Sequence, residues 1–264
     1  MKLFIAFLLS LQPLILSAQD QHILKSNLMP GDDTVWVITP QSYDTSEYYP
    51  AIYLLHGVMG NYRSWYELIN LQEYADKYRF IIICPDGFSD SYYLNSQVDT
   101  SWQIERFFSE VLYPKMLEIY SIDKDKIFIT GLSMGGTGAM YIFLKNPELF
   151  LSAGSTSGIM DLNYSSYKYT SLSRMLGDYD SNRQLFNSHS PVNLLQNISE
   201  TGKYILFDCG SEDYLYESNN AFRKKCDELK IKATYVSQPG NHERTYWQKS
   251  IRYHFDFFNS LIRK

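Results

Sequence analysis

The sequence of 264 residues has few cysteines, glycines and prolines and no block of charge of one sign. Its three cysteines are too few for a small disulfide-rich domain or for a zinc module with several cysteine ligands. Its 14 glycines and 9 prolines argue against a fibrous or disordered chain. The net charge is −5, and the Lys and Arg residues are not gathered into a basic patch, so we expect no nucleic-acid partner.

Long apolar runs are also missing, except at the start of the chain. Lys2 is followed by a mostly apolar stretch over residues 3–11, and the small residues Ser17 and Ala18 come soon after. This pattern predicts a secretory signal peptide over residues 1–18, which places the mature protein in the periplasm or the medium. The stretch is shorter than a membrane span of about 20 residues, so we expect no membrane association of the mature form.

Residues 19–264 alternate short apolar runs with amphipathic segments and have no linker or internal repeat. The runs end at Gly, Pro, Asp or other loop residues, which is typical of buried parallel strands. We expect strands at 35–38 (in an early hairpin), 51–55, 80–84, 126–130, 204–207 and 234–236. Helices are expected at 102–120, 215–230 and 246–262, with Pro114 bending or splitting the first. The alternation predicts one α/β domain, a mostly parallel doubly wound sheet with helices on both faces.

A Gly-Leu-Ser-Met-Gly sequence at residues 131–135 lies between a predicted strand and a predicted helix. This is the strand–turn–helix setting of a nucleophile elbow, which makes Ser133 the candidate nucleophile. Gly131 and Gly135 leave room where a side chain would collide with the neighbouring strand and helix. The backbone N–H of Met134, at the start of the helix, is then a candidate oxyanion donor.

A serine nucleophile needs a base, and His242 is the candidate because it follows the last predicted strand. Its loop emerges at the same edge of the sheet as Ser133. The other four histidines receive different interpretations: His22 on the surface, His56 in the loop after the second strand, His189 in a turn and His254 in the core.

Asp213 is the candidate for the carboxylate that orients the base, because it lies in the loop after the 204–207 strand. Asp208 and Glu212 are alternatives in the same segment. The resulting order of Ser133, Asp213 and His242 is that of α/β-hydrolases and differs from the orders of chymotrypsin and subtilisin. The loop that follows the 51–55 strand would supply the second oxyanion donor, the N–H of Val58.

The sequence resembles the esterase D, tributyrin esterase and feruloyl esterase group of α/β-hydrolases, which includes S-formylglutathione hydrolases. The resemblance spans residues 33–261 and is carried by Tyr-Leu-Leu-His-Gly at 53–57, Ser-Trp at 64–65, Pro-Asp-Gly at 85–87, Gly-Leu-Ser-Met-Gly-Gly at 131–136, Ser-Pro-Val-Asn-Leu at 190–194, Cys-Gly-Ser-Glu-Asp at 209–213 and Pro-Gly-Asn-His at 239–242. It implies the same triad and oxyanion donors, no metal and no organic cofactor. Arg244 departs from it, because many relatives have an aromatic residue there.

These features together predict an exported serine carboxylesterase that works through an acyl-enzyme. Its substrates would be acetyl or feruloyl esters of plant polysaccharide, or short-chain acyl esters of small molecules. An acyltransferase of the same fold and an S-formylglutathione-type thioesterase are the alternatives. We expect Trp65, Tyr93 and His56 to contact substrate. Tyr92, Tyr164, Tyr167 and Tyr169 would either extend an aromatic platform or pack an insertion between residues 159 and 186.

Overall fold

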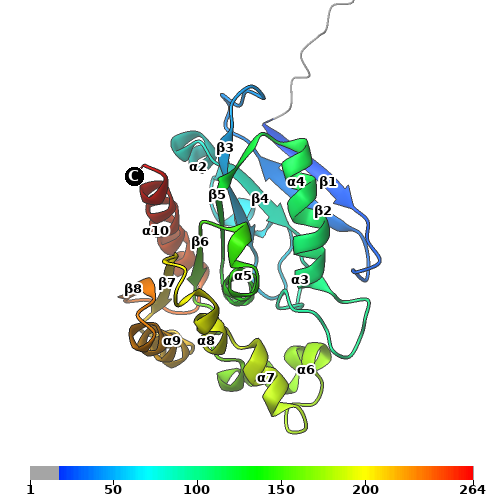
Figure 1. Cartoon of the computed structure of the whole chain (residues 1–264), viewed down its shortest axis with the longest axis vertical. Helices are drawn as coiled ribbons and strands as arrows, with labels where there is room; N and C mark the ends of the chain where they lie inside the picture. The colour runs from blue at the N-terminus through cyan, green and yellow to red at the C-terminus, as the bar shows by residue number, and fades with distance from the viewer. Residues whose placement is uncertain (1–17, 264) are drawn as a thin grey trace, which may run out of the picture.

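The computed structural model describes residues 18–263 (Figure 1). The predicted signal peptide lies outside these residues, except for Ala18. An eight-stranded sheet has the order β1-β2-β4-β3-β5-β6-β7-β8. Its strands are β1 (Gln19–Leu24), β2 (Asp33–Ile38), β3 (Tyr49–Leu55), β4 (Ile81–Pro85), β5 (Ile122–Gly131), β6 (Ser152–Thr156), β7 (Tyr204–Gly210) and β8 (Lys232–Gln238). The pairs β1–β2 and β2–β4 are antiparallel and the others are parallel, so the expected early hairpin and mostly parallel sheet are confirmed.

Helices cover both faces of the sheet, as predicted. The first face carries α3 (Ile104–Phe107), α4 (Tyr113–Ile119), α5 (Met134–Lys145) and α9 (Tyr216–Glu228). The second face carries α1 (Ser64–Leu68), α2 (Leu71–Tyr78) and α10 (Arg244–Ile262). In Figure 1, α2 and α10 lie to one side of the sheet and α3 and α4 to the other. Between β6 and β7 the chain forms α6 (Ser171–Leu176), α7 (Arg183–His189) and α8 (Pro191–Leu194), together with 3-10 turns. No helix among the described residues is long and apolar enough to cross a membrane.

Strand β6 was not predicted, because its sequence Ser-Ala-Gly-Ser-Thr lacks the large apolar residues that mark a buried strand. All five residues are nevertheless buried. The reason is close packing on both faces. A Cβ on Gly154 would lie 2.4 Å from Nδ1 of His254 in α10, and a Cβ on Gly136 in α5 would lie 2.6 Å from Oγ of Ser155. Small residues are therefore required where two helices approach this strand.

The segment that was expected to bend or split at Pro114 is helical without a break over residues 104–119, and its winding changes before the proline. A π-helical turn at Phe108–Leu112 joins α3 to α4, and Pro114 lies in the first turn of α4. Proline is tolerated there because the N–H groups of the first turn have no acceptor within the helix. The helical segment thus continues past the proline through a local change of winding.

A buried polar cluster attaches α10 to the sheet. Asp208 at the end of β7 is 1% exposed, and its Oδ2 lies 2.7 Å from Nε2 of His254. Its Oδ1 accepts hydrogen bonds from the hydroxyls of Thr156 and Ser250, at 2.8 and 2.7 Å. Nδ1 of His254 lies 2.7 Å from the hydroxyl of Thr130. The expectation that His254 is a core residue is confirmed, although its contacts are largely polar.

Removal of this carboxylate should destabilise the fold. Asp208→Ala leaves two hydroxyls and an imidazole buried without their acceptor, so we expect the free energy of unfolding to fall by about 3 to 5 kcal/mol. Denaturant unfolding would measure this difference. Asp227→Ala, which removes an exposed carboxylate paired with Arg223 at 2.7 Å, is the control and should change stability little. Equal stability of the two variants would contradict a structural role for the Asp208 cluster.

Candidate active site

The junction between β5 and α5 holds Ser133 in a strained backbone conformation, with φ 52° and ψ −119°. Two glycines make this turn possible. A Cβ on Gly135 would lie 2.2 Å from the carbonyl oxygen of Leu55, and one on Gly131 would lie 2.5 Å from the backbone of Gly135. The chain therefore reverses tightly against the end of β3. This places the Ser133 side chain at the carboxyl edge of the sheet, where the sequence predicted a nucleophile elbow.

The structure brings the three predicted triad residues together. Nε2 of His242 lies 2.9 Å from Oγ of Ser133, and Nδ1 of the same ring lies 2.9 Å from Oδ2 of Asp213. The Asp213 side chain is completely buried, whereas that of His242 is 15% exposed. Burial by itself raises the pKa of the Asp213 carboxyl. Hydrogen bonds from His242 and from the N–H of Leu215 outweigh it and hold that pKa below its usual value.

The two alternative carboxylates are engaged elsewhere. Asp208 bonds to His254 in the core, and Glu212 accepts a hydrogen bond from the Asn241 amide at 3.3 Å. His189 lies 2.8 Å from the carbonyl of Leu185 at the end of α7. Among the described residues, only Asp213 forms an ion pair or hydrogen bond with His242 through a carboxylate. The ionised Asp213 can therefore fix the orientation and tautomer of this imidazole.

The loop after β3 presents the Val58 peptide beside Ser133. A Cβ on Gly57 would lie 3.5 Å from Cβ of Ser133 and 2.6 Å from Cδ1 of Leu132, so a larger residue would require the Leu132 side chain to move. The Gly57 carbonyl accepts a hydrogen bond from the Gly60 N–H at 3.0 Å and lies 2.7 Å from Nδ1 of His56. In a trans peptide the C=O and the next N–H point in opposite directions. These contacts hold the Gly57 carbonyl on the side of His56. The N–H of Val58, which belongs to the same peptide, therefore points away from His56.

Three side chains that were expected to contact substrate are instead buried. Trp65, Tyr93 and His56 are each 1% exposed. The indole N–H of Trp65 donates to the carbonyl of Leu55 at 3.0 Å, and the Tyr93 hydroxyl accepts from the N–H of His56 at 3.1 Å. Burial lowers the pKa of His56, whose Nε2 contacts the carbonyl of Asp86. The prediction of substrate contact is corrected, because these residues support the loop around Gly57 from within the protein.

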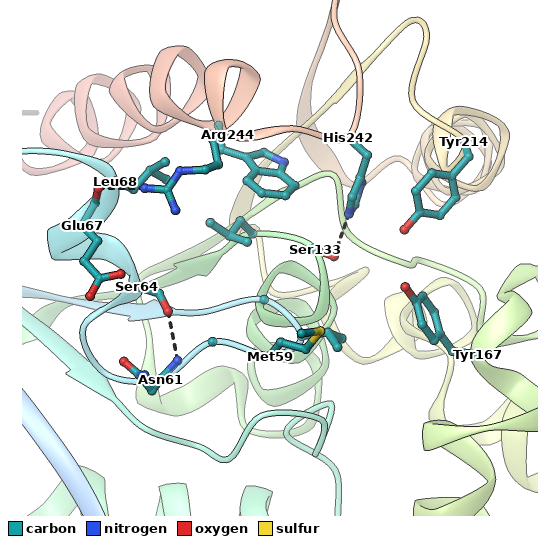
Figure 2. A pocket seen from close by; sticks show the side chains of 15 residues that line it. Met59, Asn61, Ser64, Glu67, Leu68, Ser133, Tyr167, Tyr214, His242 and Arg244 are labelled. Carbon is teal, nitrogen blue, oxygen red and sulfur yellow. Dashed lines mark hydrogen bonds between the residues drawn. The ribbon is translucent and has the colours of Figure 1, made fainter.

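A cavity of about 410 Å³ opens above Ser133 and His242 (Figure 2). Besides these two residues it is lined by Gly57, Val58, Met59, Gly60, Asn61, Ser64, Glu67, Leu68, Leu132, Tyr167, Tyr214, Arg244 and Trp247. Of the tyrosines proposed for an aromatic platform, only Tyr167 contributes to this lining. Tyr92 is fully buried, and Tyr164 and Tyr169 are 64% and 58% exposed on the insertion.

Sequence reasoning missed Tyr214 and Trp247 as lining residues. Their rings pack against the imidazole of His242, with centroids 4.7 and 5.0 Å from its centre. Their positions offered a signal, because Tyr214 directly follows Asp213 and Trp247 lies in the first turn of α10, soon after His242. Among residues 18–263, no group of three or more His, Cys, Asp or Glu side chains is arranged to hold a metal ion. The cysteines Cys84, Cys209 and Cys226 are buried free thiols.

The chain is similar to several known proteins. A family model described as "Putative esterase" matches residues 26–257. The acetyl esterase of Caldicellulosiruptor saccharolyticus is 27% identical over 266 residues, covering 89% of this chain and 96% of that protein. The S-formylglutathione hydrolase of Arabidopsis thaliana is 25% identical over 238 residues, covering 81% and 82%. The solved structure of FphF, a fluorophosphonate-binding serine hydrolase of Staphylococcus aureus, superposes with a TM-score of 0.80 at 23% identity, covering 92% of this chain and 98% of FphF.

Proposed function

This chain belongs to the Esterase family of serine hydrolases that act on ester bonds, and we propose that Ser133, His242 and Asp213 are its catalytic triad. The observation that carries the proposal is the hydrogen-bonded series from Ser133 through His242 to the buried Asp213, with 2.9 Å at both steps. Ser133 and His242 of this series line the cavity together with Val58. This is the arrangement that nucleophilic catalysis by serine requires.

The reaction would proceed in two steps. Oγ of Ser133 attacks the ester carbonyl carbon while His242 takes its proton, and the resulting oxyanion accepts hydrogen bonds from the N–H groups of Met134 and Val58. His242 then gives the proton to the leaving alcohol as the C–O bond breaks, which leaves an acyl-Ser133 ester. A water molecule, deprotonated by His242, attacks this ester and releases the acid. Asp213 stabilises the charged imidazole in both steps.

Replacement of the nucleophile should abolish turnover without unfolding the protein. For Ser133→Ala we expect kcat on 4-nitrophenyl acetate to fall by about 10⁴-fold or more, with an unchanged thermal melt. A fluorophosphonate probe should add mass to the native protein and not to this variant. Ser188→Ala on the surface is the matched control and should retain full activity. Persistent hydrolysis by Ser133→Ala would refute the proposed nucleophile.

We further propose that the substrates are acetyl or feruloyl esters of plant polysaccharide, or short-chain acyl esters. The likeness to an acetyl esterase supports the acetyl group. A second hollow of about 430 Å³ shares Val58, Met59 and Tyr167 with the cavity above Ser133 and His242. The two hollows together give room for a large alcohol group of the substrate. In Figure 2 the phenol groups of Tyr167 and Tyr214 face one another beside His242, and such rings suit a sugar or aryl group. The likeness to an S-formylglutathione hydrolase favours a thioesterase as the second candidate.

A substrate panel combined with one ring deletion would separate these possibilities. Tyr167→Ala should raise the KM for acetylated xylan or methyl ferulate by about 10-fold and that for 4-nitrophenyl acetate much less, because only a larger substrate reaches this ring. Tyr164→Ala, which removes an exposed ring of the same insertion, is the control. An equal effect on all esters would assign Tyr167 to packing. Faster turnover of S-formylglutathione than of any oxygen ester would favour the thioesterase.

Export is likewise a proposal, and the apolar stretch after Lys2 supports it. When the full chain is expressed in a bacterium with a secretory pathway, we expect the protein outside the cytoplasm, with a new amino terminus near Gln19. Mass spectrometry of the amino-terminal peptide in each cell fraction would measure this. Recovery of cytoplasmic protein that still carries residues 1–18 would contradict export.

A further inference from the structure

The cavity above Ser133 and His242 has two ends that differ in the chemistry of their side chains (Figure 2). One end holds Tyr167 and Tyr214. The opposite end, beyond Ser133 and His242 in Figure 2, is lined by Leu68 and by the polar and charged side chains of Asn61, Ser64, Glu67 and Arg244. We call this second region the polar end. The proposed reaction does not use any of its side chains.

Arg244 is held in place at the polar end. It is the first residue of α10, and its Nη2 donates to the carbonyl of Glu67 in α1 at 2.8 Å. Four residues further along α10, the amide of Gln248 donates to the carbonyl of Leu68, also at 2.8 Å. These two bonds tie the start of α10 to the end of α1. The Arg244 guanidinium is thus a positioned group in the cavity wall, with N–H groups beyond the one that Glu67 occupies.

The charge of Arg244 is not balanced by a neighbouring carboxylate. Among the described residues, Arg244 forms no ion pair, and Glu67 at the same end pairs with Arg63 at 3.6 Å. Of the other acids nearby in sequence, Glu243 accepts from the Thr245 hydroxyl and Asp213 is buried against His242. Arg244 is therefore an exposed cation of the cavity wall that forms no ion pair among the described residues.

The remaining groups of the polar end favour an anionic ligand. Oδ1 of Asn61 accepts from the N–H of Arg63 at 2.8 Å, which leaves the Asn61 amide N–H groups as donors. Oγ of Ser64 accepts from the N–H of Asn61 at 2.9 Å, which leaves its hydroxyl proton to donate. The Arg244 guanidinium shares the polar end with an amide donor and a hydroxyl donor, and such donors are complementary to a carboxylate, whose two oxygens only accept.

We propose that Arg244 binds a carboxylate carried by the substrate, so that esters of carboxylate-bearing molecules are preferred over neutral ones. This inference rests on the proposed ester hydrolysis at Ser133 and adds the charge of the substrate to it. The carboxylate belongs either to the acyl group or to the alcohol, and it occupies the polar end while the ester carbonyl lies at Ser133.

Two pairs of esters isolate the charge on each side of the scissile bond. On the acyl side, 4-nitrophenyl hemisuccinate differs from 4-nitrophenyl butyrate by a carboxylate in place of a methyl group. On the alcohol side, 4-acetoxybenzoate differs from 4-acetoxybenzamide by a carboxylate in place of a neutral amide. For one pair we expect the native protein to have a kcat/KM about 10-fold or more higher on the charged ester, a preference that decreases as salt is added.

Variants assign this preference to Arg244. Arg244→Gln should lower the ratio of kcat/KM on the charged ester to kcat/KM on the neutral ester to about 1, whatever its effect on the neutral ester, and Arg244→Lys should retain part of the preference. Arg252→Gln removes a cation from the same helix outside this cavity, and should leave the preference intact. The same preference in Arg244→Gln as in the native protein, or no preference in either pair, would overturn the inference.

Binding to an inactive protein keeps this test separate from catalysis. The intact esters 4-acetoxybenzoate and 4-acetoxybenzamide, and the acyl-side pair, can be titrated calorimetrically into Ser133→Ala with and without Arg244→Gln. Tighter binding of a charged ester that disappears with Arg244→Gln supports the inference. Equal binding of charged and neutral esters rejects it, even where hydrolysis at Ser133 is established. Conversely, charge-dependent binding by a native protein that hydrolyses no ester would reject only the proposed function.

Discussion

The site depends on the contact between the end of β3 and the start of α5. At this point the backbone of Gly135 is so close to the carbonyl of Leu55 that a Cβ would lie 2.2 Å from it. That approach forces Ser133 into its positive φ and sets α5 directly against the sheet. It also brings the Gly57 loop beside Ser133, because this loop continues from the same strand. The proposed nucleophile and both proposed oxyanion donors therefore share one steric constraint.

Two histidine–aspartate pairs lie near the carboxyl edge of the sheet and differ in their access to solvent. The pair of His254 and Asp208 is buried, with side-chain exposures of 0% and 1%. Its remaining hydrogen bonds go to hydroxyl groups of the protein. In the pair of His242 and Asp213 the histidine is 15% exposed, and its second nitrogen faces Ser133. The buried pair thus attaches α10 to the sheet, whereas the histidine of the other pair reaches the cavity.

The positions of the cavity residues follow from strand order. Ser133, Tyr214 and His242 come from segments that follow β5, β7 and β8, while Met59 follows β3. Because these strands are parallel, their carboxyl ends meet at one edge of the sheet. The polar end of the cavity is formed differently, because the packing of α10 on α1 positions Arg244 there. The residues that line this cavity are therefore divided between the sheet edge and a helix–helix junction.

The sequence alone was enough to predict the parallel α/β architecture, the elbow at Ser133 and the candidates His242 and Asp213, because apolar runs and glycine positions are local signals. It did not reveal β6, whose small residues are explained only by the helices that pack against it. It ranked Asp213 above Asp208 from loop position alone, and only the structure shows that these residues, five apart in the chain, bind different histidines. It also misplaced Trp65 and Tyr93, since adjacency to a motif does not specify which way a ring points. Only the tertiary structure determines the burial of β6, the partner of each aspartate and the direction of these rings, because all three depend on contacts between segments that are distant in the chain.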